Sequence, residues 1–187
     1  MIMTPRMKKI IPCVLLLLIL NGCSVEKEVV FDGATMGTTY QVKIVAGYFK
    51  NTSGLKKKID NRLQAINQSM STYLPDSEIS RFNAIRDTRG KLAVSDDFLQ
   101  VMLASRDIYE KTGGAWDGTV KPLLNLWGFG NTQQPHRVPD DAEIKKQMRG
   151  VGFQHIGIFP EGYLQKNKNT LTLDLASIAK GYAVDQV

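Results

Sequence analysis

The sequence predicts an α+β fold, because strand-like and helical segments follow one another without the strict βαβ repeat of a doubly wound sheet. Two observations support this prediction. Residues 39–45 alternate between apolar and polar side chains, which is the two-residue period of a half-buried strand. Residues 55–70 carry apolar side chains at every third or fourth position, which is the period of a helix with one buried face.

The first predicted elements are two strands, at residues 29–31 and 39–45. Residues 32–38 between them have mostly small side chains, and we expect a loop there that lets a ligand approach the backbone. Ser53 is suited to cap the helix that follows. The apolar stripe of this helix comprises Leu55, Ile59, Leu63, Ile66 and Met70.

A second helix is predicted to begin at Ser95, because two aspartates in its first turn complement the helix dipole. We expect it to end at the glycine pair 113–114, since glycine favours the conformation that terminates helices. A shorter helix is expected over residues 141–149. Three strands are expected after it, at residues 156–159, 163–166 and 170–173.

The N-terminus resembles a bacterial lipoprotein signal peptide, which we assign to residues 1–22. A basic start precedes an apolar run that is shorter than the roughly 20 residues needed to span a membrane. Leu20-Asn21-Gly22-Cys23 then resembles a lipobox, and Cys23 is the expected lipidation site. An ordinary secretory peptide that happens to contain a cysteine is the alternative.

These assignments predict a lipid-anchored tether at residues 23–28 and a single domain at residues 29–187. Acyl chains on Cys23 would hold the protein on a membrane surface. We therefore expect a protein of the bacterial cell envelope that is anchored on the periplasmic side, with the inner membrane favoured over the outer membrane.

Composition argues against several classes of function. The chain carries 24 basic and 18 acidic residues, a net charge of +6, and the predicted signal peptide contains three of the basic ones. The remaining excess of 21 over 18 gives no indication of nucleic-acid binding. The two cysteines are Cys13 and Cys23, so residues 29–187 have no thiol for a disulfide or a metal site. The sequence also lacks the phosphate-binding and dinucleotide-binding glycine motifs and the His-Glu-x-x-His zinc motif.

Five segments are unusually rich in small, polar and aromatic side chains. They are residues 34–40, 71–83, 114–120, 122–130 and 174–185. In their order and amino-acid sequence these segments resemble the ApbE family, the FAD:protein FMN transferases. The resemblance extends from Phe31 to Val187. It implies a β-rich, T-fold-like α+β fold with packed helices that binds FAD and Mg²⁺.

The resemblance implies an enzyme that transfers FMN from FAD, through a phosphoester bond, to a threonine or serine of exported flavoproteins and releases AMP. Subunits of sodium-pumping or electron-transfer complexes are the expected acceptors. Mg²⁺-dependent hydrolysis of FAD to FMN and AMP is one alternative. A non-catalytic, lipid-anchored flavin-binding protein is the other, and it applies if the chain ends at Val187.

The resemblance also implies which side chains bind FAD. Met36 and Tyr73 are suited to pack against flat rings. Asp174 can accept hydrogen bonds from ribose hydroxyls or the adenine amine, and Lys180 can offset phosphate charge at a helix start. The full set of expected contacts is Met36, Tyr73, Ala115, Trp116, Asp117, Asp174 and Lys180.

The resemblance implies one Mg²⁺ ligand within this chain, the backbone carbonyl of Ser177, and oxygen ligands are the type that Mg²⁺ prefers. The catalytic residues and the other metal ligands are expected in a C-terminal portion beyond Val187. The helix predicted near the C-terminus shows no cap before that residue, and we therefore expect the fold to be incomplete there and this chain alone to be inactive.

Overall fold

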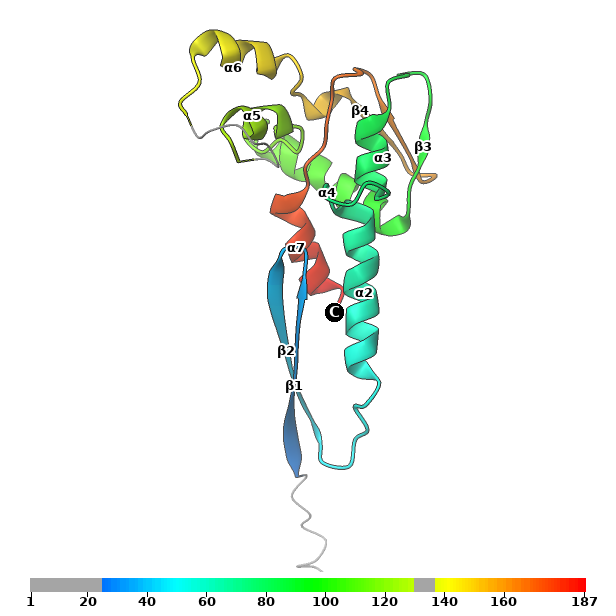
Figure 1. Ribbon diagram of the computed structural model, residues 1–187. Helices are drawn as coiled ribbons and strands as arrows, with labels where there is room; N and C mark the ends of the chain where they lie inside the picture. The colour runs from blue at the N-terminus through cyan, green and yellow to red at the C-terminus, as the bar shows by residue number, and fades with distance from the viewer. Residues whose placement is uncertain (1–24, 130–136) are drawn as a thin grey trace, which may run out of the picture.

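The computed structural model describes residues 25–129 and 137–187 (Figure 1). The expected signal peptide and the expected lipidation site, Cys23, lie outside these residues. Within the two described ranges, none of the helices has the length and apolar character that a membrane span requires.

Helices and small antiparallel sheets are mixed along the chain, which confirms the α+β prediction. The first sheet is a hairpin of β1 (Glu26–Thr35) and β2 (Thr38–Gly47). The second sheet has the order β3 (Leu92–Ala93), β5 (Tyr163–Lys166) and β4 (Ile156–Phe159). The helices are α2 (Leu55–Met70), α3 (Glu78–Ala84), α4 (Asp96–Lys111), α5 (Lys121–Leu126), α6 (Asp141–Met148) and α7 (Ala176–Asp185).

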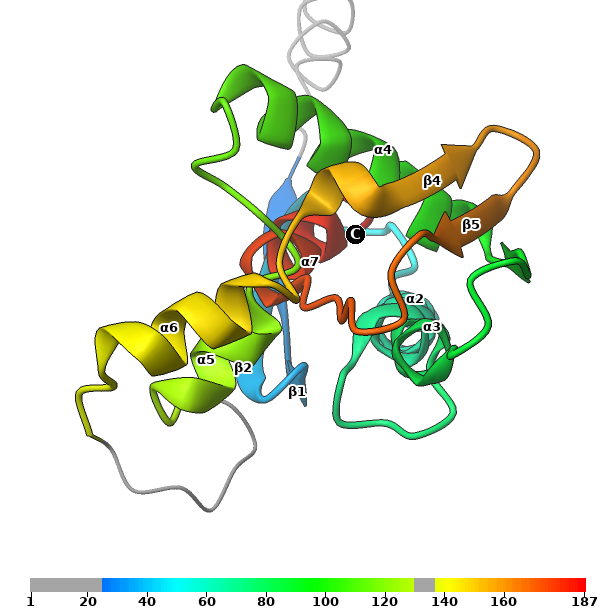
Figure 2. The same ribbon diagram turned by 90° about the horizontal axis from the view of Figure 1, so that it is seen from above.

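The core lies where α2, α4, α7 and the second sheet meet, whereas α5 and α6 pair with each other at one side (Figure 2). Helix α2 is central because it contacts β1, α3, α4 and α7. Its predicted stripe is buried at four of five positions, Ile59, Leu63, Ile66 and Met70. Other members of the core with no exposed surface are Ile79, Phe82, Phe98, Met102, Leu164, Leu171, Leu173 and Leu175.

Most predicted helix ends are confirmed. The Ser95 side chain caps α4 by accepting a hydrogen bond from the Phe98 amide (3.3 Å). Helix α6 covers most of the predicted range 141–149 and begins at a capping box. The expected cap of α2 is wrong. The N-cap residue is Gly54 rather than Ser53, so no side chain caps this helix.

The loop expected at residues 32–38 is wrong. Strands β1 and β2 remain paired up to Thr35 and Thr38, so the connection is only the two residues Met36 and Gly37. At its other end, β1 begins at Glu26, inside the segment that we expected to be a tether. The small side chains of residues 32–38 therefore do not indicate an open loop.

The strand expected at residues 170–173 is also wrong, because its backbone bonds to side chains instead of to a strand. Asn83 Nδ2 donates to the Leu173 carbonyl (2.9 Å), and Asn83 Oδ1 accepts from the Leu173 amide (2.6 Å). Lys166 Nζ donates to the Leu171 carbonyl (3.1 Å). The segment leads into α7, which ends at Asp185 and does not continue to Val187.

Lys166 is a buried charge at this junction, with 1% of its surface exposed. Its Nζ donates to the carbonyls of Asn83 (3.2 Å) and Leu171 (3.1 Å) and lies 5.4 Å from the centre of the Phe82 ring. Burial lowers the pKa of Lys166 to about 8, and the nearby charge of Arg86 acts in the same direction.

We expect the free energy of unfolding to rise with pH between about 8 and about 10.5. In this range the unfolded chain still binds the Lys166 proton and the folded protein does not, so a higher pH favours the folded state. Denaturant titrations at several pH values should show a smaller rise in Lys166→Met. The exposed Lys145→Met variant is the control, and an equal rise in Lys166→Met would contradict the prediction.

Candidate functional site

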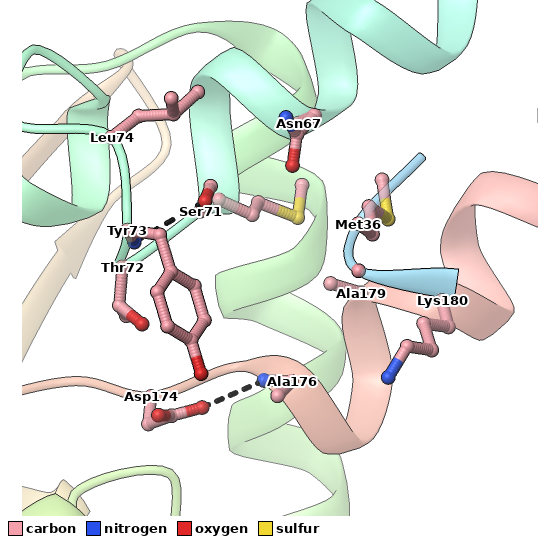
Figure 3. Close-up of a pocket in the computed structure, with 12 residues that line it drawn as sticks. Met36, Asn67, Ser71, Thr72, Tyr73, Leu74, Asp174, Ala176, Ala179 and Lys180 are labelled. Atoms are coloured by element: carbon pink, nitrogen blue, oxygen red, sulfur yellow. Dashed lines mark hydrogen bonds between the residues drawn. The ribbon is translucent and has the colours of Figure 1, made fainter. Parts of the chain in front are cut away.

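One cavity, of about 550 Å³, lies between the β1–β2 turn, the C-terminal end of α2 and the start of α7 (Figure 3). Four of the seven expected FAD contacts line it: Met36, Tyr73, Asp174 and Lys180. These residues come from three regions that are far apart in the sequence. In Figure 3, Tyr73 and Lys180 extend into this space from different elements, with Asp174 nearby.

Met36 reaches the cavity because of the tight hairpin turn. Met36 has a φ of 50° and Gly37 a φ of 71°, and two positive φ values at the central positions define a type I′ turn, which fits the twist of paired strands. Positive φ is uncommon for a residue other than glycine and costs backbone energy. The turn thus holds the Met36 side chain in a position that an ordinary loop would not fix.

The segment that carries Tyr73 is held by hydrogen bonds from and to the side chains of two serines. Buried Ser77 donates to the Ser71 carbonyl (2.6 Å) and caps α3 by accepting from the Ser80 amide (3.1 Å). The Tyr73 amide donates to Ser71 Oγ (3.3 Å). The Tyr73 side chain itself is 73% exposed, so its ring is available to a ligand.

Asp174 is positioned by bonds on both sides of its backbone. The Asp174 amide donates to the Gly118 carbonyl (2.8 Å), and the preceding Leu173 is held by Asn83. The carboxylate Oδ1 accepts from the Ala176 amide at the start of α7 (3.0 Å). A carboxylate next to a helix N-terminus is electrostatically favourable, and it faces the cavity.

Helix α7, which carries Lys180, is held against α2 and α4 by a charged network. Arg62 makes two hydrogen bonds to the Asp97 carboxylate (2.6 and 2.7 Å) and a third to Gln186 Oε1 (2.6 Å). Tyr182 donates to Asp97 Oδ1 (2.5 Å). The hydrogen bonds from Arg62 lower the pKa of Asp97, while partial burial opposes them.

We expect Asp97→Asn to lower the free energy of unfolding at neutral pH by about 1 kcal/mol, since a partly buried, two-bond ion pair is lost. Because the folded pKa of Asp97 is lowered, its stabilisation is present above the unfolded pKa of about 4 and is lost below it. The difference between wild type and variant should therefore shrink in acid. Asp107→Asn, which breaks an exposed pair on the same helix, is the control and should have little effect.

The other three expected FAD contacts, Ala115, Trp116 and Asp117, do not line the cavity. Trp116 Nε1 donates to Ser177 Oγ (3.1 Å), so this loop lies beside the first turn of α7. Both oxygens of Asp117 accept hydrogen bonds, Oδ1 from Thr119 and Oδ2 from the Phe153 amide (3.0 Å). Asp117 therefore stabilises the loop, and its direct contact with FAD stays a prediction.

The expected Mg²⁺ ligand, the Ser177 carbonyl, lies in the first turn of α7. Across residues 25–129 and 137–187 there is no group of three or more His, Cys, Asp or Glu side chains arranged to hold a metal ion.

The cavity also contains residues that the sequence analysis did not select as contacts. Asn67 and Met70 come from the last turns of α2, and Ala179 from α7. Asn67 is a polar residue next to the apolar stripe of α2, and this position in the sequence could have indicated a ligand contact. The remaining lining residues are Gly37, Ser71, Thr72, Leu74 and Ala176.

Comparison with known proteins gives consistent matches. A sequence model of the ApbE family matches residues 36–187. The chain is 41% identical over 174 residues to the FAD:protein FMN transferase of Vibrio cholerae serotype O1, covering 91% of this chain and 51% of that protein. It is 38% identical over 161 residues to the protein of the same name from Escherichia coli K12, covering 84% and 46%.

Solved structures agree with these matches. The flavin transferase ApbE from Vibrio cholerae superimposes with a TM-score of 0.80 at 39% identity, over 86% of this chain and 52% of that one. The apo form of the Pseudomonas stutzeri flavinyl transferase ApbE gives a TM-score of 0.78 at 36% identity, over 86% and 51%. The chain spans about half the length of the relatives that it matches.

Proposed function

Because the chain belongs to the ApbE family, we propose that the intact protein is an enzyme that transfers FMN from FAD to a threonine or serine of exported flavoproteins. The phosphoester forms as the diphosphate bond of FAD breaks, and AMP leaves. The observation that carries this proposal is the cavity, which brings together Met36, Tyr73, Asp174 and Lys180.

The side chains of the cavity suit the parts of FAD. Tyr73 offers an exposed ring and Met36 a polarizable sulfur for stacking against a flat ring system. The Asp174 carboxylate can accept hydrogen bonds from ribose hydroxyls or the adenine amine. Lys180 supplies a positive charge for the diphosphate. Cavities that bind cofactors commonly combine such apolar walls with a few polar groups.

Mg²⁺ dependence is part of the proposal, with the Ser177 carbonyl as one ligand. We also propose that the protein is lipid-anchored at Cys23 on the periplasmic side of the bacterial inner membrane. Its acceptors would then be exported flavoproteins, such as subunits of sodium-pumping or electron-transfer complexes.

The test is to incubate the intact protein with FAD and Mg²⁺, with and without an acceptor flavoprotein apoprotein. We expect the acceptor to gain the mass of FMN and AMP to appear in equal amount, and chelation of Mg²⁺ to stop both. AMP and FMN released equally well without acceptor would favour FAD hydrolysis instead. FAD binding without any AMP would favour a non-catalytic flavin-binding protein.

A further inference from the structure

The β1–β2 hairpin connects two distant ends of the molecule. Its turn, Met36–Gly37, lines the cavity, and the strands run from there for ten residues each without interruption. At about 3.3 Å per residue, the opposite end of the hairpin lies roughly 30 Å from the turn. Figure 1 shows this end at the bottom of the molecule, beside the loop that leads into α2.

Three large apolar side chains are exposed at this lower end. The exposed fractions are 61% for Val25, 57% for Tyr48 and 96% for Phe49. The Tyr48 amide donates to the Val25 carbonyl (2.7 Å), and the rings of Tyr48 and Phe49 pack edge to face at 5.4 Å. The cluster is therefore an ordered feature, and grouped apolar side chains on a surface indicate an interaction site.

One lysine contacts this apolar cluster, and others follow it in the loop and in the first turn of α2. Lys27 Nζ lies 5.9 Å from the centre of the Tyr48 ring. Lys50, Lys57 and Lys58 are exposed, and within the described residues none of these three forms an ion pair. Residues 25–28 and 46–60 together carry five lysines against three acids, Glu26, Glu28 and Asp60.

We propose that Val25, Tyr48 and Phe49, with Lys27 and the neighbouring Lys50, form a membrane-contact surface that binds anionic lipid. Aromatic side chains favour the boundary between headgroups and acyl chains, and lysines near the surface are attracted to anionic headgroups. The segment that precedes Val25 joins the fold at this same end. We favour a bilayer over a protein partner on the basis of the proposed anchor at Cys23, which would hold lipid at this same end.

This contact sets the position of the cavity relative to the membrane. With the apolar cluster at the headgroups and the hairpin rising from it, the cavity would lie roughly 30 Å above the lipid surface. The contact itself does not require FAD binding or acylation of Cys23. Its test can therefore fail or succeed independently of the proposed enzymatic function.

The test is flotation with lipid vesicles of the intact protein produced without residues 1–23, so that neither the signal peptide nor the anchor is present. We expect association with vesicles of phosphatidylethanolamine and phosphatidylglycerol, weaker association with phosphatidylcholine alone, and loss at high salt. Tyr48→Ala with Phe49→Ala should weaken association roughly tenfold or more, since burial of apolar area is lost. Phe129→Ala is the control, because Phe129 is 72% exposed but follows α5 at the opposite side of the structure.

A second measurement locates the contact without depending on affinity. Phe49→Trp should show tryptophan quenching by vesicles with brominated acyl chains, which Trp116 and Trp127 of the parent should not show. Equal flotation of the double alanine variant and its parent would overturn the proposal. So would unchanged flotation combined with a loss of FMN transfer in lipid-free solution, because that result would identify a protein-docking surface.

Discussion

Replacing Asn83 with alanine is expected to lower the free energy of unfolding by about 2–4 kcal/mol, because two hydrogen bonds to a buried backbone segment are lost. Asn83 donates to the Leu173 carbonyl and accepts from the Leu173 amide, at 2.9 and 2.6 Å. Leu173 has no exposed surface, so water cannot easily replace the lost partners. Chemical denaturation of the intact protein measures the change.

The same variant should bind FAD more weakly, because Leu173 directly precedes Asp174 in the cavity wall. Asn61→Ala is a matched control, since it removes the same side chain from an exposed position on α2. It should leave both stability and affinity close to those of the wild type. An Asn83→Ala protein as stable as Asn61→Ala would show that the Asn83 bonds contribute little.

Local signals predicted the long helices well. The stripe of α2 and the Ser95 cap of α4 depend on residues within a few positions of one another, and both are confirmed. Helix α3 was not predicted, because seven residues are too few for a clear periodicity. Its N-cap residue, Ser77, could have indicated where this helix begins.

The predictions were wrong for segments whose structure depends on residues far away in the sequence. Residues 170–173 alternate like a strand, but the segment takes its hydrogen bonds from Asn83, about ninety positions earlier in the sequence. Residues 32–38 looked like an open loop, yet cross-strand pairing continues almost to the turn. No local pattern distinguishes these outcomes, because the competing partner lies elsewhere in the chain.

The candidate site was predicted in part, and only through resemblance to a family. Met36, Tyr73, Asp174 and Lys180 line one cavity, although nothing in their local sequence indicates that they meet. Trp116 and Asp117 belong to a loop beside the cavity, where the structure gives them hydrogen-bonding roles with Ser177, Thr119 and Phe153.

Asp174→Ala is expected to weaken FAD binding by roughly 10- to 100-fold, which corresponds to the loss of one hydrogen bond to a charged group. Titration of the intact protein with FAD, followed by calorimetry or flavin fluorescence, measures the affinity. Asp185→Ala is the control, because it removes an exposed carboxylate from the C-terminal end of α7, the helix that Asp174 precedes. FAD affinity equal to the wild type in Asp174→Ala would exclude this carboxylate as a ligand contact.

The asparagine variant separates the two roles that the structure allows for Asp174. In Asp174→Asn, a side-chain oxygen can still accept from the Ala176 amide, so the start of α7 should keep its geometry. The negative charge is lost, and an amide accepts hydrogen bonds from ribose or adenine less strongly than a carboxylate does. Weak FAD binding with unchanged stability would therefore identify a ligand contact. Wild-type affinity in Asp174→Asn, together with weak binding in Asp174→Ala, would instead show that Asp174 acts by positioning α7 and Lys180.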